Sequence, residues 1–346
     1  MGRVMTAAFG GAFACIVACG CVPPETSVDS ARLLKNFDEN ADKLPYFKAE
    51  GTLTVKAYAD GWFRVFKRSE DFTVLLAKDP ENPAGPCDFA LYVLDLGEPV
   101  MGMGSSTVDG MYYMFIGFGQ SGMCNVGRTA LAGAPGIEGM SLDISAAAGS
   151  DKSPGKGKKL DINPLQLVSA FAVIPPSNDL TSMPGAILQM QGDHWPFEYI
   201  LTCIDRQGST QRIVPLHRMI FDWKKDVEPR LPRRIEYLDP NGVWVMTAKI
   251  RKYKPVDVAD FPNPPQDPPV MPSEIIYTWR NARSGKKMIT LTLELSDVWA
   301  PEIDYSEACR LIHRIPKGLL NKARLIDAHL DAPKSNNPKN NPELSQ

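Results

Sequence analysis

The sequence predicts a mainly β fold of the α+β class, built on a curved antiparallel sheet with a few short helices. Thirty prolines and 27 glycines in 346 residues interrupt regular elements too often for a helical bundle. Several segments alternate apolar and polar residues with a period of two, most clearly residues 287–295. With 44% hydrophobic and 23% charged residues, the chain has a globular composition and enough length for a sizeable core.

The first segment is predicted to be an export signal followed by a lipid anchor. A short positive start precedes an apolar and small-residue run, residues 4–18, that is too short to span a bilayer as a permanent helix. Its end, Ile16-Val17-Ala18-Cys19, is similar to the bacterial lipobox, in which the cysteine receives diacylglycerol. We therefore predict a signal peptide at residues 1–18 and lipid attachment at Cys19, with Cys21 as the alternative. A conventional signal peptide with incidental cysteines is the other interpretation.

A lipid anchor and tether are expected at residues 19–29, followed by one β domain at residues 30–330. The domain begins with an amphipathic helix at residues 30–44, where Leu33, Leu34 and Phe37 recur at helical spacing, and Pro45 ends it. A second, short helix is expected at residues 164–172. Strands are expected at residues 47–57, 62–67, 72–78, 88–95, 112–118, 197–204, 213–222, 232–237, 243–253, 274–281 and 287–295.

Several segments lack periodicity and are predicted to be irregular. Residues 96–110 are a glycine-rich connection, and residues 119–159 are a flexible insertion rich in Gly, Ala, Ser and Lys. Residues 255–272 hold seven prolines and form a spacer that cannot be a central strand. Residues 331–346 have too few apolar groups to order themselves and are predicted to be a disordered tail.

Composition and spacing exclude most chemical activities. The formal net charge of −2 gives no reason to expect nucleic-acid binding. The four histidines have no metal-ligand spacing, and the glycine pattern at residues 117–122 is followed by loop-like sequence instead of a helix. We expect no metal, no cofactor and no enzymatic activity. No disulfide is assigned among the cysteines left in the exported chain, which are Cys21, Cys87, Cys124, Cys203 and Cys309.

The predicted sheet carries more aromatic and aliphatic residues than one short helix could cover. The sheet therefore either closes over a side-chain core or leaves an apolar trough that suits acyl chains. Strand parity selects the residues expected to wall this trough or core. They are Leu53, Val55, Leu91, Val93, Phe115, Trp244, Met246, Tyr277, Trp279, Leu291 and Leu293.

The order of elements and several short phrases resemble the LolA/LolB-like lipoprotein-sorting family. The resemblance extends over about residues 30–299 and includes the lipobox, the amphipathic helix, FKAEGTLTV at 47–55, LDLGEPV at 94–100, MYYMF at 111–115 and the hairpin at 232–242. It implies an unclosed antiparallel half-barrel whose concave apolar face is covered by one to three short helices. It also implies handling of lipoprotein acyl chains in the periplasm.

Some features depart from that family. Lys78-Asp79-Pro80 stands where the soluble carrier has a Lys-Arg-Pro step, so the arginine associated with lid movement is missing. The receptor's exposed apolar loop has only a candidate counterpart, residues 100–103. By the usual sorting preference, Gly20 after Cys19 resembles a signal for outer-membrane delivery.

We therefore expect a monomeric lipoprotein on the periplasmic side of the outer membrane that binds acyl chains or lipoproteins, similar to the LolB acceptor. The alternative hypothesis is a structural or sensory envelope lipoprotein that binds a protein partner and carries no lipid. An envelope hydrolase would need a catalytic constellation that the sequence does not offer.

Overall fold

The structure is a computed structural model of the whole chain. The residues that it describes are 30–59, 63–81, 87–107, 110–116, 123–128, 140–143, 159–162, 164–173, 185–191, 198–207, 212–222, 231–239, 241–258, 266–280, 284–300, 303–312 and 323–325. The expected signal peptide, both candidate lipid-attachment cysteines (Cys19 and Cys21), the tether and the C-terminal tail lie outside these residues.

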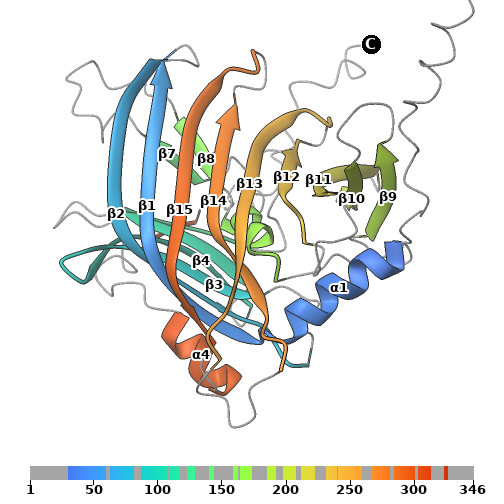
Figure 1. Cartoon of the computed structure of the whole chain (residues 1–346). Coiled ribbons are helices and arrows are strands. Elements are labelled where there is room, and N and C mark those ends of the chain that lie inside the picture. The colour runs from blue at the N-terminus through green and yellow to red at the C-terminus, as the bar shows by residue number, and fades with distance from the viewer. Residues whose placement is uncertain are drawn as a thin grey trace, which may run out of the picture.

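One sheet of fourteen strands dominates the fold, in the order β16-β6-β5-β4-β3-β2-β1-β15-β14-β13-β12-β11-β10-β9 (Figure 1). All neighbours are antiparallel except β16 and β6. The two end strands do not pair with each other, so the sheet is an unclosed half-barrel, which confirms the expected mainly β class. The strands are β1 (Tyr46–Ala59), β2 (Phe63–Ala77), β3 (Asp88–Asp95), β4 (Glu98–Ser106), β5 (Met111–Ile116), β6 (Met123–Arg128), β9 (Gly185–Gln191), β10 (Glu198–Gln207), β11 (Arg212–Asp222), β12 (Arg234–Leu238), β13 (Trp244–Pro255), β14 (Val270–Arg280), β15 (Lys287–Trp299) and β16 (Ala323–Leu325).

Short helices cover both faces of this sheet. α1 (Ser30–Asp42) and α3 (Pro164–Val168), which continues as the 3₁₀ helix η3 (Ser169–Phe171), pack on the inner face. α4 (Tyr305–Ile312) packs on the outer face, in one cluster with residues of β1, β2, β3, β5 and β6. Among the described residues, no helix combines the length and the apolar character needed to cross a bilayer.

Apart from the two strands expected at 62–67 and 72–78, the expected elements are confirmed with shifted ends, including the strands at 88–95 and 112–118 and the helix at 164–172. β2 is one continuous strand where two were predicted. The glycine-rich connection at 96–110 contains β4, and the insertion at 119–159 contains β6 and β7 (Met140–Asp143), which pairs with β8 (Lys159–Ile162). The proline spacer ends earlier than predicted, because β14 already begins at Val270 and includes Pro272.

Two tight turns fix the register of neighbouring strands. In the predicted turn between β12 and β13, the Asp239 carboxylate accepts hydrogen bonds from the backbone N–H groups of Asn241 and Val243 at 2.9 and 2.8 Å, and Gly242 has a φ of 79°. The turn between β3 and β4 places both Leu96 and Gly97 at positive φ, 50° and 84°. Leu96 is fully exposed at the tip of this hairpin.

The layer beneath α4 is anchored by a buried carboxylate. Asp88 is fully buried, and its oxygens accept hydrogen bonds from the Thr107 hydroxyl at 2.7 Å, the Tyr305 hydroxyl at 2.5 Å and the Thr107 backbone N–H at 3.0 Å. Because Thr107 follows β4 and Tyr305 opens α4, these bonds attach the helix to the sheet. Each partner offsets part of the desolvation of the charge. The apolar side chains under α4 form the outer cluster, which consists of Tyr46, Leu75, Ala77, Ala90, Tyr92, Tyr113, Phe115, Cys124, Ala308 and Ile312.

Candidate functional site

The inner face of the half-barrel carries an almost continuous apolar layer, which we call the inner cluster. Alternate residues of the central strands point into it, because successive side chains of a strand leave on opposite faces. The threonines of β15, by contrast, lie on the other parity, opposite Thr54 of β1 and Thr278 of β14. The inner cluster includes Phe47, Leu53, Phe72, Val74, Phe89, Leu91, Met114, Tyr199, Leu201, Phe221, Tyr237, Met246, Ile275, Tyr277, Leu291 and Leu293.

Most of the side chains selected from strand parity meet in this cluster. The eight that are buried there are Leu53, Leu91, Val93, Met246, Tyr277, Trp279, Leu291 and Leu293, and the half-buried Val55 packs against them. Phe115 and Trp244 lie elsewhere. Phe115 belongs to the outer cluster, since the inward residues of β5 are Tyr112 and Met114. A register shift in the β12–β13 pair falls between Trp244 and Met246 and turns Trp244 away from the inner face, where it is 49% exposed.

Helix side chains fill the hollow in this structure. α1 contributes Leu33, Leu34 and Phe37, all buried. The turn from α3 into η3 contributes Leu167 and Phe171. The ring of Phe171 lies between β1 and β3, with its centroid 5.8 Å from that of Phe47 and 6.2 Å from that of Phe89. A ligand in the hollow would therefore have to take the place of these side chains.

Three polar contacts attach the C-terminal half of α1 to the sheet. The Asn40 side chain donates to the carbonyl of Val270 at 3.0 Å and accepts from its N–H at 2.8 Å. Lys43 forms an ion pair with Asp267 at 3.0 Å. The Lys78 ammonium, at the end of β2, donates to the carbonyl of Ala41 in the last turn of the helix. Lys78 is the basic residue of the Lys-Asp-Pro step in the sequence.

The environment of Lys78 lowers the pKa of its ammonium group. Burial lowers the pKa of its ammonium to about 8, against the opposing influence of Asp42. A buried cation is normally avoided unless it is hydrogen-bonded, and the helix C-terminus supplies the acceptor. Lys78 thus holds α1 in place through the negative end of the helix dipole.

Two tyrosine hydroxyls fix the other helical cover. Tyr277 on β14 donates to the carbonyl of Leu167 at 2.9 Å, and Tyr237 on β12 lies 2.7 Å from the hydroxyl of Ser169. Both rings belong to the inner cluster, and burial raises the pKa of both phenols. The phenols therefore stay neutral and act as hydrogen-bonding groups at the bottom of an apolar layer.

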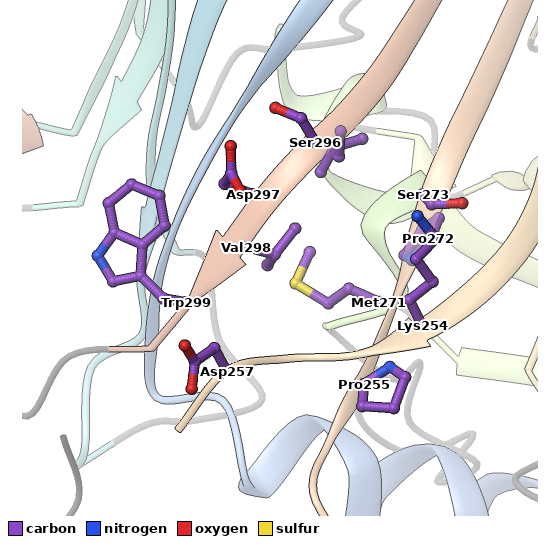
Figure 2. Close-up of a pocket in the computed structure, with 11 residues that line it drawn as sticks. Lys254, Pro255, Asp257, Met271, Pro272, Ser273, Ser296, Asp297, Val298 and Trp299 are labelled. Carbon is purple, nitrogen blue, oxygen red and sulfur yellow. The ribbon is translucent and has the colours of Figure 1, made fainter. Parts of the chain in front are cut away.

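A pocket of about 350 Å³ lies where β14 and β15 diverge (Figure 2). Met271 and Leu295 at its base are buried members of the inner cluster, and Val298 packs against that cluster. Polar residues surround the opening. The full lining is Lys254, Pro255, Asp257, Met271, Pro272, Ser273, Leu295, Ser296, Asp297, Val298 and Trp299.

The described histidine, cysteine and carboxylate side chains are not arranged for metal binding or for thiol chemistry. No three His, Cys, Asp or Glu side chains gather as a metal site in the described ranges. Cys87, Cys124, Cys203 and Cys309 are free and buried. Burial raises the pKa of all four thiols, with that of Cys309 raised to about 11, which disfavours the nucleophilic thiolate.

Sequence reasoning missed the exposed hairpin tip at Leu96 and the helix α4. The exposed Leu96 is carried by Asp95-Leu96-Gly97-Glu98, where a Gly at the second turn position signals a two-residue hairpin. α4 was missed because the helix is short, although Asp304 caps it by accepting from the N–H of Glu307 at 2.8 Å. An acidic residue three positions before a glutamate is the pattern that could have identified this start.

Comparisons with known proteins give similarity at the level of folds. No family model and no curated protein matches the chain. A LolA superfamily protein from Nitrosomonas europaea is 10% identical, with a TM-score of 0.41 over 81% of this chain and 97% of that one. A DUF1329 family protein from Desulfovibrio piger is 13% identical, with a TM-score of 0.38 over 78% and 90%. A domain named for outer-membrane lipoprotein sorting, from Vibrio parahaemolyticus, is 10% identical, with a TM-score of 0.40 over 81% and 98%; the chain is similar to each of these structures.

Proposed function

We propose that this protein binds acyl chains, of free lipids or of lipoproteins, in the hollow of the half-barrel when α1 and η3 move aside. The observation that carries the proposal is the make-up of the hollow. A broad apolar sheet face is covered by two short helical segments, and a few hydrogen bonds and one ion pair attach them. A cover of this kind can be exchanged for a ligand without unfolding the sheet.

Burial of an acyl chain and burial of the present helix side chains contribute hydrophobic free energies of similar size. Burying a palmitoyl-sized chain contributes about 10 kcal/mol at roughly 0.8 kcal/mol per methylene. Five large side chains lose roughly 8–15 kcal/mol together when they leave an apolar layer for water. The present cover contributes five such side chains, which are Leu33, Leu34, Phe37, Leu167 and Phe171. Since neither term dominates, an acyl chain can replace them reversibly.

The location that we propose follows from the start of the sequence. A lipid on Cys19, or on Cys21 in the second frame, would hold the protein on the periplasmic side of the outer membrane. A monomer fixed there with an exchangeable apolar hollow would suit an acceptor similar to LolB, which takes lipoproteins at the membrane where it is anchored. The role requires binding and release, and no covalent chemistry.

Uptake of a fluorescent fatty acid by the full chain tests the proposal. Asn40→Ala removes both hydrogen bonds to Val270 and should speed uptake severalfold, because the removed pair contributes about 1–2 kcal/mol to closure. Lys35→Ala is the matched control, since Lys35 lies on α1 and its ion pair within the described part of the chain is with Glu39 of the same helix, at 3.6 Å. Equal uptake rates for both variants and the unmodified chain would contradict the movable cover.

A second candidate, a structural or sensory lipoprotein that binds a protein partner, is favoured by exposed apolar side chains in the β9–β13 part of the sheet. Five large apolar side chains on β9, β11 and the start of β13 are exposed: Ile187, Ile213, Leu216, Val243 and Trp244. Such a group is typical of contact surfaces. Mass spectrometry of lipids that co-purify with the chain separates the two. Absence of bound lipid together with absence of fatty-acid uptake would favour the protein-binding role.

A further inference from the structure

The pocket lies in a gap in the sheet between β14 and β15, and we call this gap the window. The ladder between these strands ends at Glu274 and Glu294, although β14 extends back to Val270 and β15 runs on to Trp299. Each strand keeps its partner on the far side, since β13 pairs with β14 as far as Val270 and β1 pairs with β15 as far as Trp299. Only the contact between β14 and β15 is interrupted.

The local sequence explains the interruption. A register shift opposite Glu50 and Gly51 leaves Ser296 as an extra residue in β15 and bends that strand. In β14, Pro272 has no N–H to donate to a neighbour. The segment after β13 then crosses the lower end of the gap, where Asp257 donates its N–H to the Val298 carbonyl at 3.0 Å and accepts from Ala300 at 3.0 Å. The opening is therefore framed on all sides by hydrogen-bonded backbone.

The base of the window belongs to the proposed lipid-binding hollow. Met271 and Leu295 are almost fully buried members of the inner cluster, and Val298 packs on it from the side of the gap. Figure 2 shows Met271 and Val298 between the two diverging strands. An apolar group that entered here would meet the layer that also contacts α1 and η3.

The rim presents opposite charges from different strands. Lys254 comes from β13, and Asp297 comes from β15 (Figure 2). Neither of these two has an ion-pair partner among the residues that the structure describes. Other charges near the opening are paired, Lys48 with Glu50 at 2.8 Å and Arg251 with Glu274 at 3.5 Å.

The remaining rim groups add acceptors. Asp257 places a second carboxylate beside Trp299. The Ser273 hydroxyl donates to the Lys252 carbonyl at 2.8 Å, and the Ser296 hydroxyl donates to the Glu50 carbonyl at 3.1 Å. Both serine oxygens can still accept a hydrogen bond. The rim thus offers the ammonium of Lys254, the carboxylate of Asp297 and the serine oxygens as acceptors around an apolar base.

We propose that this window binds the zwitterionic headgroup of a phospholipid-like amphiphile, with a phosphate at Lys254 and a primary ammonium at Asp297. The apolar base receives the adjoining hydrocarbon. This inference rests on the proposed function, because it assigns the polar end of a lipid whose chain lies in the hollow. A cavity of about 350 Å³ is at the small end of ligand pockets and suits a headgroup, not a whole lipid.

The test compares single-chain lipids that differ only in the headgroup. The full chain, in a non-ionic detergent, is titrated with lysophosphatidylethanolamine or lysophosphatidylglycerol, and bound lipid is counted by native mass spectrometry. We expect a preference for the ethanolamine lipid. Asp297→Asn should reduce this preference about fivefold, the effect of one exposed charge pair. Lys254→Gln should weaken both lipids. Asp71→Asn, an equal charge change on an exposed position of β2, should change neither.

The outcomes separate this inference from the proposed function. Equal binding of both lysolipids by all variants, with normal fatty-acid uptake, would overturn the headgroup site and leave the hollow as a lipid site. Competition by free phosphoethanolamine that depends on Lys254 and Asp297, without any fatty-acid uptake, would support the site and contradict the proposed function. The competition experiment with free phosphoethanolamine also distinguishes binding of a lipid headgroup from binding of a free zwitterion.

Discussion

The half-buried imidazole of His217 makes the stability of this protein depend on pH. His217 lies on β11, where its ring centroid is 5.9 Å from that of Tyr237. Its Nε2 atom is shielded from solvent and has no hydrogen-bond partner among the described residues. Burial lowers the pKa of the imidazole from 6.5 to about 4. The neighbours across the two ladders, Cys203 and Tyr237, are neutral in this pH range and supply no compensating charge.

The direction of the effect follows from proton binding. Between pH 6.5 and about 4, the unfolded chain binds a proton at His217 and the folded chain does not. The free energy of unfolding therefore falls as the pH is lowered through this interval. The full shift corresponds to about 3 kcal/mol as an upper limit, because the half-buried ring can gain some hydration.

Urea unfolding followed by tryptophan fluorescence at pH 7, 6, 5 and 4 measures this dependence. His217→Phe keeps the ring volume and removes the titration, so the difference between the two proteins should grow as the pH falls. Carboxylates such as Glu236, whose pKa burial raises, act equally in both proteins and cancel in the difference. Parallel pH profiles for the two proteins would refute the reasoning.

Three further predictions concern packing, the outer layer and the anchor. In Gly51→Ala, the added Cβ would lie 1.9 Å from the Glu294 carbonyl oxygen, so β1 and β15 must shift and the free energy of unfolding should fall by about 2 kcal/mol or more; an unchanged urea midpoint would contradict this. Asp88→Ala leaves the Tyr305 hydroxyl without its acceptor and should lower the free energy of unfolding by about 2–4 kcal/mol, with faster proteolysis near α4 as the independent readout. Cys19→Ser should release the protein from membranes in fractionation, and retention would remove the predicted anchor.

Strands can be predicted from the sequence where apolar and polar residues alternate and only one face is buried. In β15 the inner residues are uniformly aliphatic and the outer ones are polar, so both the strand and its buried face were predicted correctly. The alternation works because one side of that strand meets the inner cluster and the other meets threonines. Eight of the eleven selected wall residues are buried in this cluster for the same reason.

Prediction fails where side chains are removed to make room or where both faces are apolar. β4 was taken for a loop because of its glycines, but a Cβ on Gly102 would lie 2.5 Å from the Phe115 ring and one on Gly104 would lie 2.2 Å from the Phe89 carbonyl oxygen. These glycines permit close packing of large neighbours in the adjacent strands. β5 has large apolar residues on both faces, so parity could not show that Phe115 faces outward.

The window could not be predicted from local sequence at all. It depends on a register shift in one strand, a proline in the next and a chain segment that returns from β13, and these meet only in the folded sheet. Lys254 and Asp297 are 43 positions apart by their residue numbers, and nothing in their local context marks them as a pair.

Among the described residues, α4 packs on the outer face of the β1–β6 part of the sheet, and no described helix packs on the outer face of β9–β11. Strands enclosed on both sides should exchange their amide hydrogens last, while β9–β11, with exposed Ile187 and Ile213, should exchange early. The part of the sheet under α4 should therefore be more rigid than the part formed by β9–β11. Widening of the half-barrel for a bulky guest would be borne mainly by the β9 end, and the α4 end would keep its shape.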